Sequence, residues 1–146
     1  MQWRWPVDGA VADSDGGIAP RGPVGVWRAT IWSIKGLRAA WDYESSFRLE
    51  VYLFVLLAPV AWWLAGDAIE RVLLIGSMLL VLAAELLNSA IEALIERYGP
   101  EHHVLAGRAK DMGSAAVFVL MMNVLLVWGS LLGPRWIAAL GAGAAG

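Results

Sequence analysis

Apolar residues repeat at helical spacing and gather into three long stretches, and this pattern predicts an all-α membrane protein. The stretches cover about 47–65, 68–98 and 112–132. An apolar segment of about 20 residues is long enough to cross the roughly 30 Å of hydrocarbon in a bilayer. We therefore predict three transmembrane helices within one domain that covers residues 23–133.

A shorter amphipathic segment precedes the first span. Between positions 24 and 43, apolar residues recur three or four apart at Trp27, Ile31, Ile34, Leu37 and Trp41. Arg28, Lys35 and Arg38 add positive charge to the same segment. The pattern is typical of a surface helix that lies on anionic headgroups with its tryptophans in the interface, although a helix packed only on protein would look alike.

The connection after the first span carries the signals of a helix start. Gly66 closes a tight connection, and Asp67 followed by Glu70 has the spacing of a capping box. In such a box the first side chain accepts from first-turn amides, while the second reaches back to an amide before the helix. We expect the second helix to begin near Ala68 and to continue to about position 98.

The flanking segments have a different composition. Residues 1–22 are rich in Gly, Pro, Asp and Ala without periodicity, and residues 134–146 are rich in Gly and Ala. We expect a flexible extension and a tail outside the domain. A polar connection, 101–111, joins the second and third spans. The first 25 residues have no apolar core followed by a small-residue cleavage site, so no secretory signal is expected.

Lysine and arginine are concentrated on one side of the predicted spans. Six lie before the first span or at its start: Arg4, Arg21, Arg28, Lys35, Arg38 and Arg48. Three lie in the second connection, at Arg97, Arg108 and Lys110, and the other side has only Arg71 and Arg135. The positive-inside rule therefore predicts that the N-terminus and the second connection are cytoplasmic.

Composition narrows the classes of function. Hydrophobic residues make up 59% of the chain and charged residues 16%, with a net charge of −2. A chain with so little net charge gives no reason to expect a nucleic-acid partner. Cysteine is absent, which excludes disulfides, thiolate metal sites and cysteine nucleophiles.

The second predicted span carries polar side chains along one side. Five of them fall within a sector of roughly 100°: Glu85, Asn88, Ser89, Glu92 and Glu96. If the helix enters the far side of the membrane at Ala68, Glu85 lies about 26 Å along it and Glu92 about 36 Å. We therefore expect Glu85 just inside the cytoplasmic edge of the hydrocarbon and Glu92 just outside it.

These depths suit two different tasks. A carboxylate in a low-dielectric environment can act as a general base, and a hydrated carboxylate suits a hard metal ion. Phosphoryl transfer can use both a base and a metal-binding carboxylate, because its catalysis depends mostly on positioning and charge neutralisation. Glu44 could supply a second metal carboxylate, and Lys110 and Arg108 could offset phosphate charge.

The same polar residues also have a purely structural interpretation. Polar side chains within spans hold helices together by hydrogen bonds, and this role explains Glu85 and Asn88 equally well when they are taken alone. Asn123 is better explained by such a hydrogen bond between helices. Glu96 and Arg97 are better explained as part of a solvated helix end. Neither GxxxxGK[ST] nor GxGxxG occurs, so any nucleotide site is of an unusual kind.

Two blocks of the sequence resemble the bacterial integral-membrane diacylglycerol kinases. The stretch ELLNSAIEALIERYGPEHHVLAGRAKDMGS, from Glu85 to Ser114, resembles the signature of that family. KGLRAAW, from Lys35 to Trp41, resembles its N-terminal half together with the residues that follow: Glu44, Phe47, Arg48 and Glu50. The resemblance covers about 27–132, with both blocks in the family's order.

The resemblance implies a homotrimer of three-span subunits in the bacterial inner membrane, with active sites between subunits at the cytoplasmic face. The implied reaction transfers the γ-phosphate of ATP, as its Mg²⁺ complex, to the hydroxyl of diacylglycerol and gives phosphatidic acid. By matching position, Glu85 resembles the general base and Asn88 the active-site asparagine. Glu44 and Glu92 resemble the metal ligands.

Further positions match the family's binding residues. The nucleotide contacts are matched by Glu101, His103, Lys110 and Asp111. The lipid site is matched by Arg38, Trp41, Arg48, Glu50 and Ser114, beside Glu85 itself. The family's arginine about ten residues before KGLRAAW is matched by Gly25, so either Arg21 or Arg28 substitutes or that contact is missing.

Two alternatives remain at the level of sequence. A kinase of a polyprenol such as undecaprenol shares the ELLNSAIE-type block, although the topology and the KGLRAAW block favour diacylglycerol. A non-enzymatic membrane scaffold would use the polar side chains only to fix the register of an oligomer.

Overall fold

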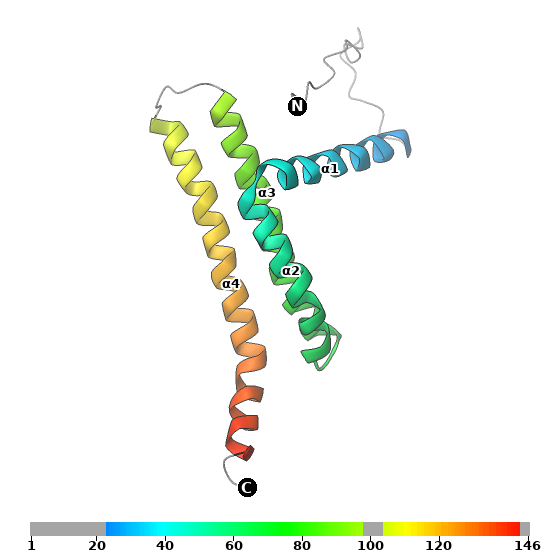
Figure 1. The fold of residues 1–146 in the computed structure, drawn as a ribbon, viewed down its shortest axis with the longest axis vertical. Helices are drawn as coiled ribbons and strands as arrows, with labels where there is room; N and C mark the ends of the chain where they lie inside the picture. Colours follow the sequence, from blue (N-terminus) through cyan, green and yellow to red (C-terminus); the bar gives the residue numbers. More distant parts are fainter. Residues whose placement is uncertain (1–22, 98–103, 144–146) are drawn as a thin grey trace. The chain divides into compact units, whose positions relative to one another are not determined.

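The computed structural model describes residues 23–97 and 104–143, and the described chain is entirely helical apart from short connections (Figure 1). Its helices are α1 (Pro23–Tyr43), α2 (Ser45–Leu64), α3 (Ala68–Arg97) and α4 (Val104–Gly143). Three segments are long and apolar enough to cross a membrane: Ser45–Leu64, Ala68–Arg97 and Val104–Ala138. The all-α class and the three candidate spans are thereby confirmed.

The chain divides after Gly36 into two units, which are described separately. The described part of the first unit is the N-terminal portion of α1, where Trp27 and Trp32 are 66% and 63% exposed. The Thr30 hydroxyl donates to the backbone oxygen of Val26 at 3.0 Å, one turn earlier in the helix. The attachment of this helix to a membrane surface stays a prediction.

A corner separates the end of α1 from α2. Glu44 has extended backbone angles, φ −106° and ψ 112°, and interrupts the helix for one residue. Arg48 then reaches back, and its Nη1 donates to the carbonyl oxygen of Trp41 at 2.8 Å. The rings of Trp41 and Tyr52 meet edge to face at 5.6 Å. An arginine can satisfy the open carbonyls at a helix end, so these contacts fix the corner that carries Glu44.

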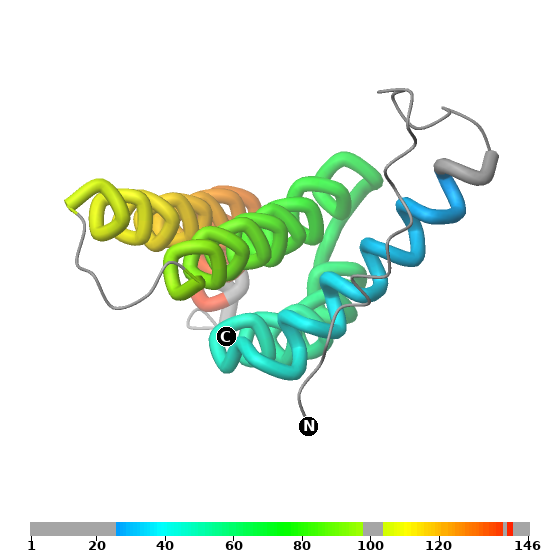
Figure 2. The backbone as a smooth tube through the Cα atoms, turned by 90° about the horizontal axis from the view of Figure 1, so that it is seen from above, coloured from blue at the N-terminus to red at the C-terminus, as the bar shows by residue number. Residues whose placement is uncertain are grey.

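Helix α3 packs against both α2 and α4 (Figures 1 and 2). Ala61, Leu74, Met78 and Leu132 form the buried centre of this packing. Trp128 of α4 also donates its Nε1–H to the carbonyl oxygen of Leu74 in α3, at 3.2 Å. This part of the interface therefore combines apolar packing with a directed hydrogen bond.

The predicted capping box is present in the connection between α2 and α3. The backbone N–H of Glu70 donates to Asp67 Oδ1 at 2.8 Å. The Glu70 carboxylate reaches back and accepts from the N–H of Gly66 at 2.7 Å. The Asp67 half of the box and the start of the helix at Ala68 are thereby confirmed, and Glu70 reaches back as expected but to the amide one residue before Asp67.

Helix α4 is longer at both ends than its apolar stretch suggested. It begins at Val104, within the expected polar connection, and it continues through Pro134 to Gly143. Proline removes one intrahelical hydrogen bond, a loss that long apolar helices tolerate when neighbouring groups compensate. Residues Glu101 and His103, for which sequence similarity implied nucleotide contacts, lie outside the described part of the chain.

Candidate functional site

Three carboxylates lie near that of Glu85, and the four come from the α1–α2 corner, from α2 and from α3. Glu85 and Glu50 are only 5% and 8% exposed. Glu50, Glu44 and Glu92 are each close enough to Glu85 for their negative charges to repel. Like charges at such range disfavour one another, so the arrangement favours a cation nearby.

Two of these carboxylates could hold a magnesium ion that is also bound by phosphate and water. No group of three or more His, Asp or Glu side chains converges tightly enough to hold a metal within residues 23–97 and 104–143. Mg²⁺ in phosphate-transferring sites usually keeps several waters and takes one or two carboxylates together with substrate phosphates. The half-buried carboxylates of Glu44 and Glu92, both close enough to Glu85 for their charges to interact, match that modest requirement.

Asn88 lies one turn beyond Glu85 on α3, at a point where α4 approaches closely. Asn88 is 9% exposed, and its Oδ1 is buried with no hydrogen-bond partner in the described chain. A Cβ atom added to Gly113 of α4 would collide with that oxygen. The glycine therefore lets α4 come near, and Asn88 keeps an acceptor that a bound molecule could use.

A salt bridge joins α3 to α4 near the same end. Lys110 Nζ lies 3.5 Å from Glu92 Oε1, and the two side chains are 54% and 24% exposed. An exposed pair of this kind contributes little to stability, so either partner can turn to another ligand at small cost. The pair brings together the residue expected to bind phosphate and a residue expected to bind metal.

Glu50 borders an apolar groove between α2, α3 and α4. The groove has a volume of about 340 Å³ and is otherwise lined by apolar side chains, including Leu53, Leu57 and Val81. Glu50 Oε2 is buried and has no hydrogen-bond partner in the described chain. A polar group at the edge of an apolar groove suits a molecule with a hydroxyl head and an alkyl tail.

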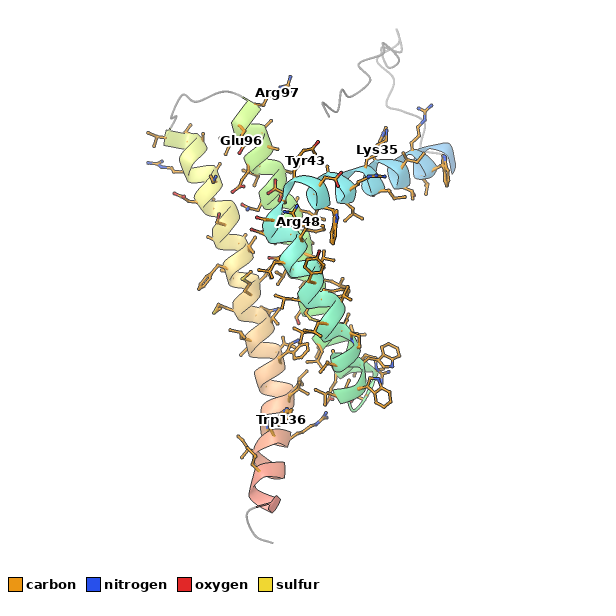
Figure 3. The ribbon with its side chains drawn as sticks, viewed as in Figure 1. Lys35, Tyr43, Arg48, Glu96, Arg97 and Trp136 are labelled. Atoms are coloured by element: carbon orange, nitrogen blue, oxygen red, sulfur yellow. The ribbon has the colours of Figure 1, made fainter. Side chains whose placement is uncertain are left out.

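The other residues expected in the site lie at the end of α1, at the α1–α2 corner and on α4. Arg38 and Trp41 are exposed near the end of α1, while Asp111 and Ser114 are exposed on α4. Arg48 lies at the corner, as Figure 3 shows, with its guanidinium engaged by α1 carbonyls. Their roles in binding stay predictions.

Figure 3 also shows Glu96 and Arg97 at the C-terminal end of α3, and both are exposed. Two features of the structure were not singled out from the sequence: the approach of Gly113 to Asn88, and the contacts of Arg135. A small residue within an apolar helix was the only signal for Gly113, and Arg135 was counted only as a charge.

Comparison with known proteins gives a consistent result. The sequence model described as "Prokaryotic diacylglycerol kinase" matches residues 31–132. The diacylglycerol kinase of Escherichia coli K12 is 52% identical over 105 residues, which cover 72% of this chain and 86% of the relative. The corresponding protein of Haemophilus influenzae is 47% identical over 104 residues, covering 71% and 88%. That of Pseudomonas aeruginosa is 46% identical over 107 residues, covering 73% and 87%.

Proposed function

The chain belongs to the prokaryotic diacylglycerol kinase family and is a kinase, and from this premise we propose that it transfers the γ-phosphate of ATP to the hydroxyl of diacylglycerol. The observation that carries the proposal is that the buried Glu85 is near two groups: Glu50, which lines the apolar groove, and Glu92, which pairs with Lys110. The lipid would reach Glu85 from the groove, and the nucleotide from Lys110.

The lipid would bind with its alkyl chains against α2, α3 and α4. The groove beside Glu50 is apolar, and the unpartnered Glu50 Oε2 offers an acceptor at its edge. A hydroxyl drawn toward the two buried carboxylates would lie within reach of Glu85. Among the exposed residues near this end, Arg38, Trp41 and Ser114 would contact the lipid head, with Arg48 holding the corner.

Glu85 would act as the general base, because a buried carboxylate beside the hydroxyl can accept its proton as the oxygen attacks the γ-phosphorus. The bond from that phosphorus to the β,γ-bridging oxygen would break, and ADP would leave. Asn88 would orient the reacting groups through the Oδ1 that has no partner in the described chain. The packing of Asn88 against Gly113 restricts its side chain, and restricted groups position reactants better than mobile ones.

The phosphates would enter from the side of Lys110. Its ammonium would turn from Glu92 to the phosphate oxygens, and Glu92 and Glu44 would hold Mg²⁺. Magnesium bound with ATP supplies neutralisation of the charge on the transferring group. Family resemblance adds Asp111, together with Glu101 and His103, as nucleotide contacts.

We further propose a bacterial inner-membrane protein with a cytoplasmic N-terminus and site, assembled as a homotrimer. The distribution of lysine and arginine supports this orientation. The exposed tryptophans at the start of α1 support contact of that helix with the membrane surface.

Glu92→Gln is expected to raise the magnesium concentration needed for half-maximal activity by roughly tenfold. Glutamine keeps the size of the side chain but removes the negative charge, and a contact to a charged group is worth about 1.5–3 kcal/mol, with 1.4 kcal/mol corresponding to a factor of ten. Activity is measured against total MgCl₂ at a fixed concentration of total ATP. An unchanged magnesium requirement would assign the metal to other residues.

The proposed reaction is tested with purified protein in detergent, by following label from γ-labelled ATP into short-chain diacylglycerol. Undecaprenol is assayed in parallel under the same conditions. Labelled phosphatidic acid supports the proposal. Transfer to undecaprenol alone would identify a polyprenol, and not diacylglycerol, as the substrate. The absence of transfer to either lipid alcohol would overturn the kinase activity and favour a scaffold.

A further inference from the structure

The end of the helices away from the carboxylates carries a second polar cluster, centred on Arg135 of α4. Arg135 Nη1 donates to the carbonyl oxygen of Leu64, at the end of α2, with a distance of 2.8 Å. Arg135 Nη2 donates to both carboxylate oxygens of Glu70 in α3, at 2.6 and 2.8 Å. One guanidinium therefore joins all three apolar helices.

The cluster is built closely around this side chain. A Cβ atom on Gly66 would lie 2.8 Å from Arg135 Nη2 and 3.3 Å from Glu70 Oε2, so glycine leaves the space that the guanidinium fills. The side chain of Glu70 is only 19% exposed. A planar guanidinium with several fixed donors suits such a three-way junction, and the ammonium of lysine lacks that geometry.

The α3–α4 interface thus has an ion pair near each of its two ends. Glu70 pairs with Arg135 at one end, and Glu92 pairs with Lys110 at the other. Between them lie the hydrogen bond from Trp128 to Leu74 and the close approach of Gly113 to α3. Because α4 continues as one helix from Lys110 through Pro134 to Arg135, the anchored Arg135 limits how far Lys110 can slide or rotate against α3.

We propose that Arg135 is a positioning residue for phosphate transfer, which holds α4 in the register where Lys110 faces Glu92. This inference rests on the proposed function, in which Lys110 turns to phosphate and Glu92 to the metal ion. The Lys110–Glu92 ion pair is then broken, and the alignment of α4 against α3 depends more heavily on the Arg135–Glu70 pair. Arg135 lies beyond residues 31–132, the part of the chain that the family model matches.

Arg135→Gln is expected to raise KM for MgATP by roughly three- to tenfold and to leave kcat within about twofold. If α4 samples other registers, only a fraction of molecules presents Lys110 and Glu92 together, and apparent affinity falls by that fraction. Bound nucleotide restores the register, so turnover at saturation is preserved. A purely structural role would instead lower kcat through loss of folded enzyme and leave KM unchanged.

Two further variants separate the junction from a general change at this end. Gly66→Ala displaces the guanidinium without altering either charged residue, and should raise KM in the same way. Gly129→Ala is the matched control on α4, because its Cβ would meet nothing within 4 Å. Arg135→Lys keeps the charge but not the geometry and should fall between wild type and Arg135→Gln.

The register is also measured without reference to activity. The chain has no cysteine, so spin labels attach only to cysteines introduced at Leu94 and Met112, which are 56% and 72% exposed. Labelled chains are diluted with unlabelled chain, so that distances within one chain dominate. Arg135→Gln and Gly66→Ala should broaden the distance distribution, and Gly129→Ala should not.

An unchanged distribution in Arg135→Gln would overturn the proposal, whatever happens to KM. A lowered kcat at constant KM would overturn it as well. If the wild type transfers phosphate to no lipid alcohol, the proposed function fails, but the spin-label distances still decide whether Arg135 sets the register.

Discussion

Glu85→Gln is expected to lower the rate of phosphate transfer to diacylglycerol by about a thousandfold, within the 10²–10⁴ range typical of general bases. Glutamine matches the shape of glutamate but cannot accept the proton of the attacking hydroxyl. Glu85 is 5% exposed, so water has little access to replace it. Transfer of labelled phosphate and binding of ATP are measured on the same preparation, and ATP binding should change little.

Two companion variants make this result specific. Glu96→Gln is the same chemical change on the same helix at an exposed position, and it should keep full activity. Glu85→Asp keeps the carboxylate but retracts it by one methylene, so it should lose turnover more than ATP binding. If Glu85→Gln kept more than a tenth of wild-type activity, the base would have to be another group. Equal loss of binding and turnover would point to a collapsed assembly.

Gly113→Ala is expected to lower transfer by roughly ten- to a hundredfold, although no residue with a proposed chemical role is changed. The added Cβ would collide with Asn88 Oδ1 and lie 3.6 Å from Ile91 Cδ1. Overpacking of this kind costs about 1–3 kcal/mol, and where that cost falls on the active position of Asn88, each 1.4 kcal/mol lowers the rate about tenfold. Either Asn88 turns away or α4 moves outward, and both changes disturb the groups beside Glu85.

Gly107→Ala provides the matched control for this prediction. It lies on the same helix, and its added Cβ would meet nothing within 4 Å. Alanine favours helix more than glycine by about 0.8–1.0 kcal/mol, so the control should be folded at least as well as wild type. Transfer rate and thermal unfolding are compared across wild type and both variants. Equal activity in the two variants would mean that α4 does not constrain Asn88.

Local sequence signals predicted the start of α3 correctly, because capping depends on residues that are neighbours along the chain. Asp67 and Glu70 specify their hydrogen bonds through spacing alone, and both bonds are present. The polar side of α3 was also visible in the sequence, since helical geometry puts Glu85 and Asn88 one turn apart, and both are buried. Hydropathy set the ends of α4 poorly, because the helix extends past the apolar stretch on both sides.

Contacts between helices were not predictable in the same way. The spacing within α3 says nothing about how near Glu50 of α2 comes to Glu85, or which residue of α4 faces Asn88. Gly113 acquires meaning only once its partner is known. Arg135 follows a proline in a segment that composition marked as a tail, yet its guanidinium contacts Leu64 and Glu70, which are distant in sequence.

The two ion pairs between α3 and α4, Glu70–Arg135 and Glu92–Lys110, restrict where residues can be inserted or deleted in these helices. An inserted or deleted residue within 70–92 or 110–135 would rotate everything beyond it by about 100° and shift it by about 1.5 Å. One ion pair could then form only at the expense of the other. Substitutions at the surface of these stretches should be accepted far more readily than insertions, and a compensating insertion would have to appear in the facing helix.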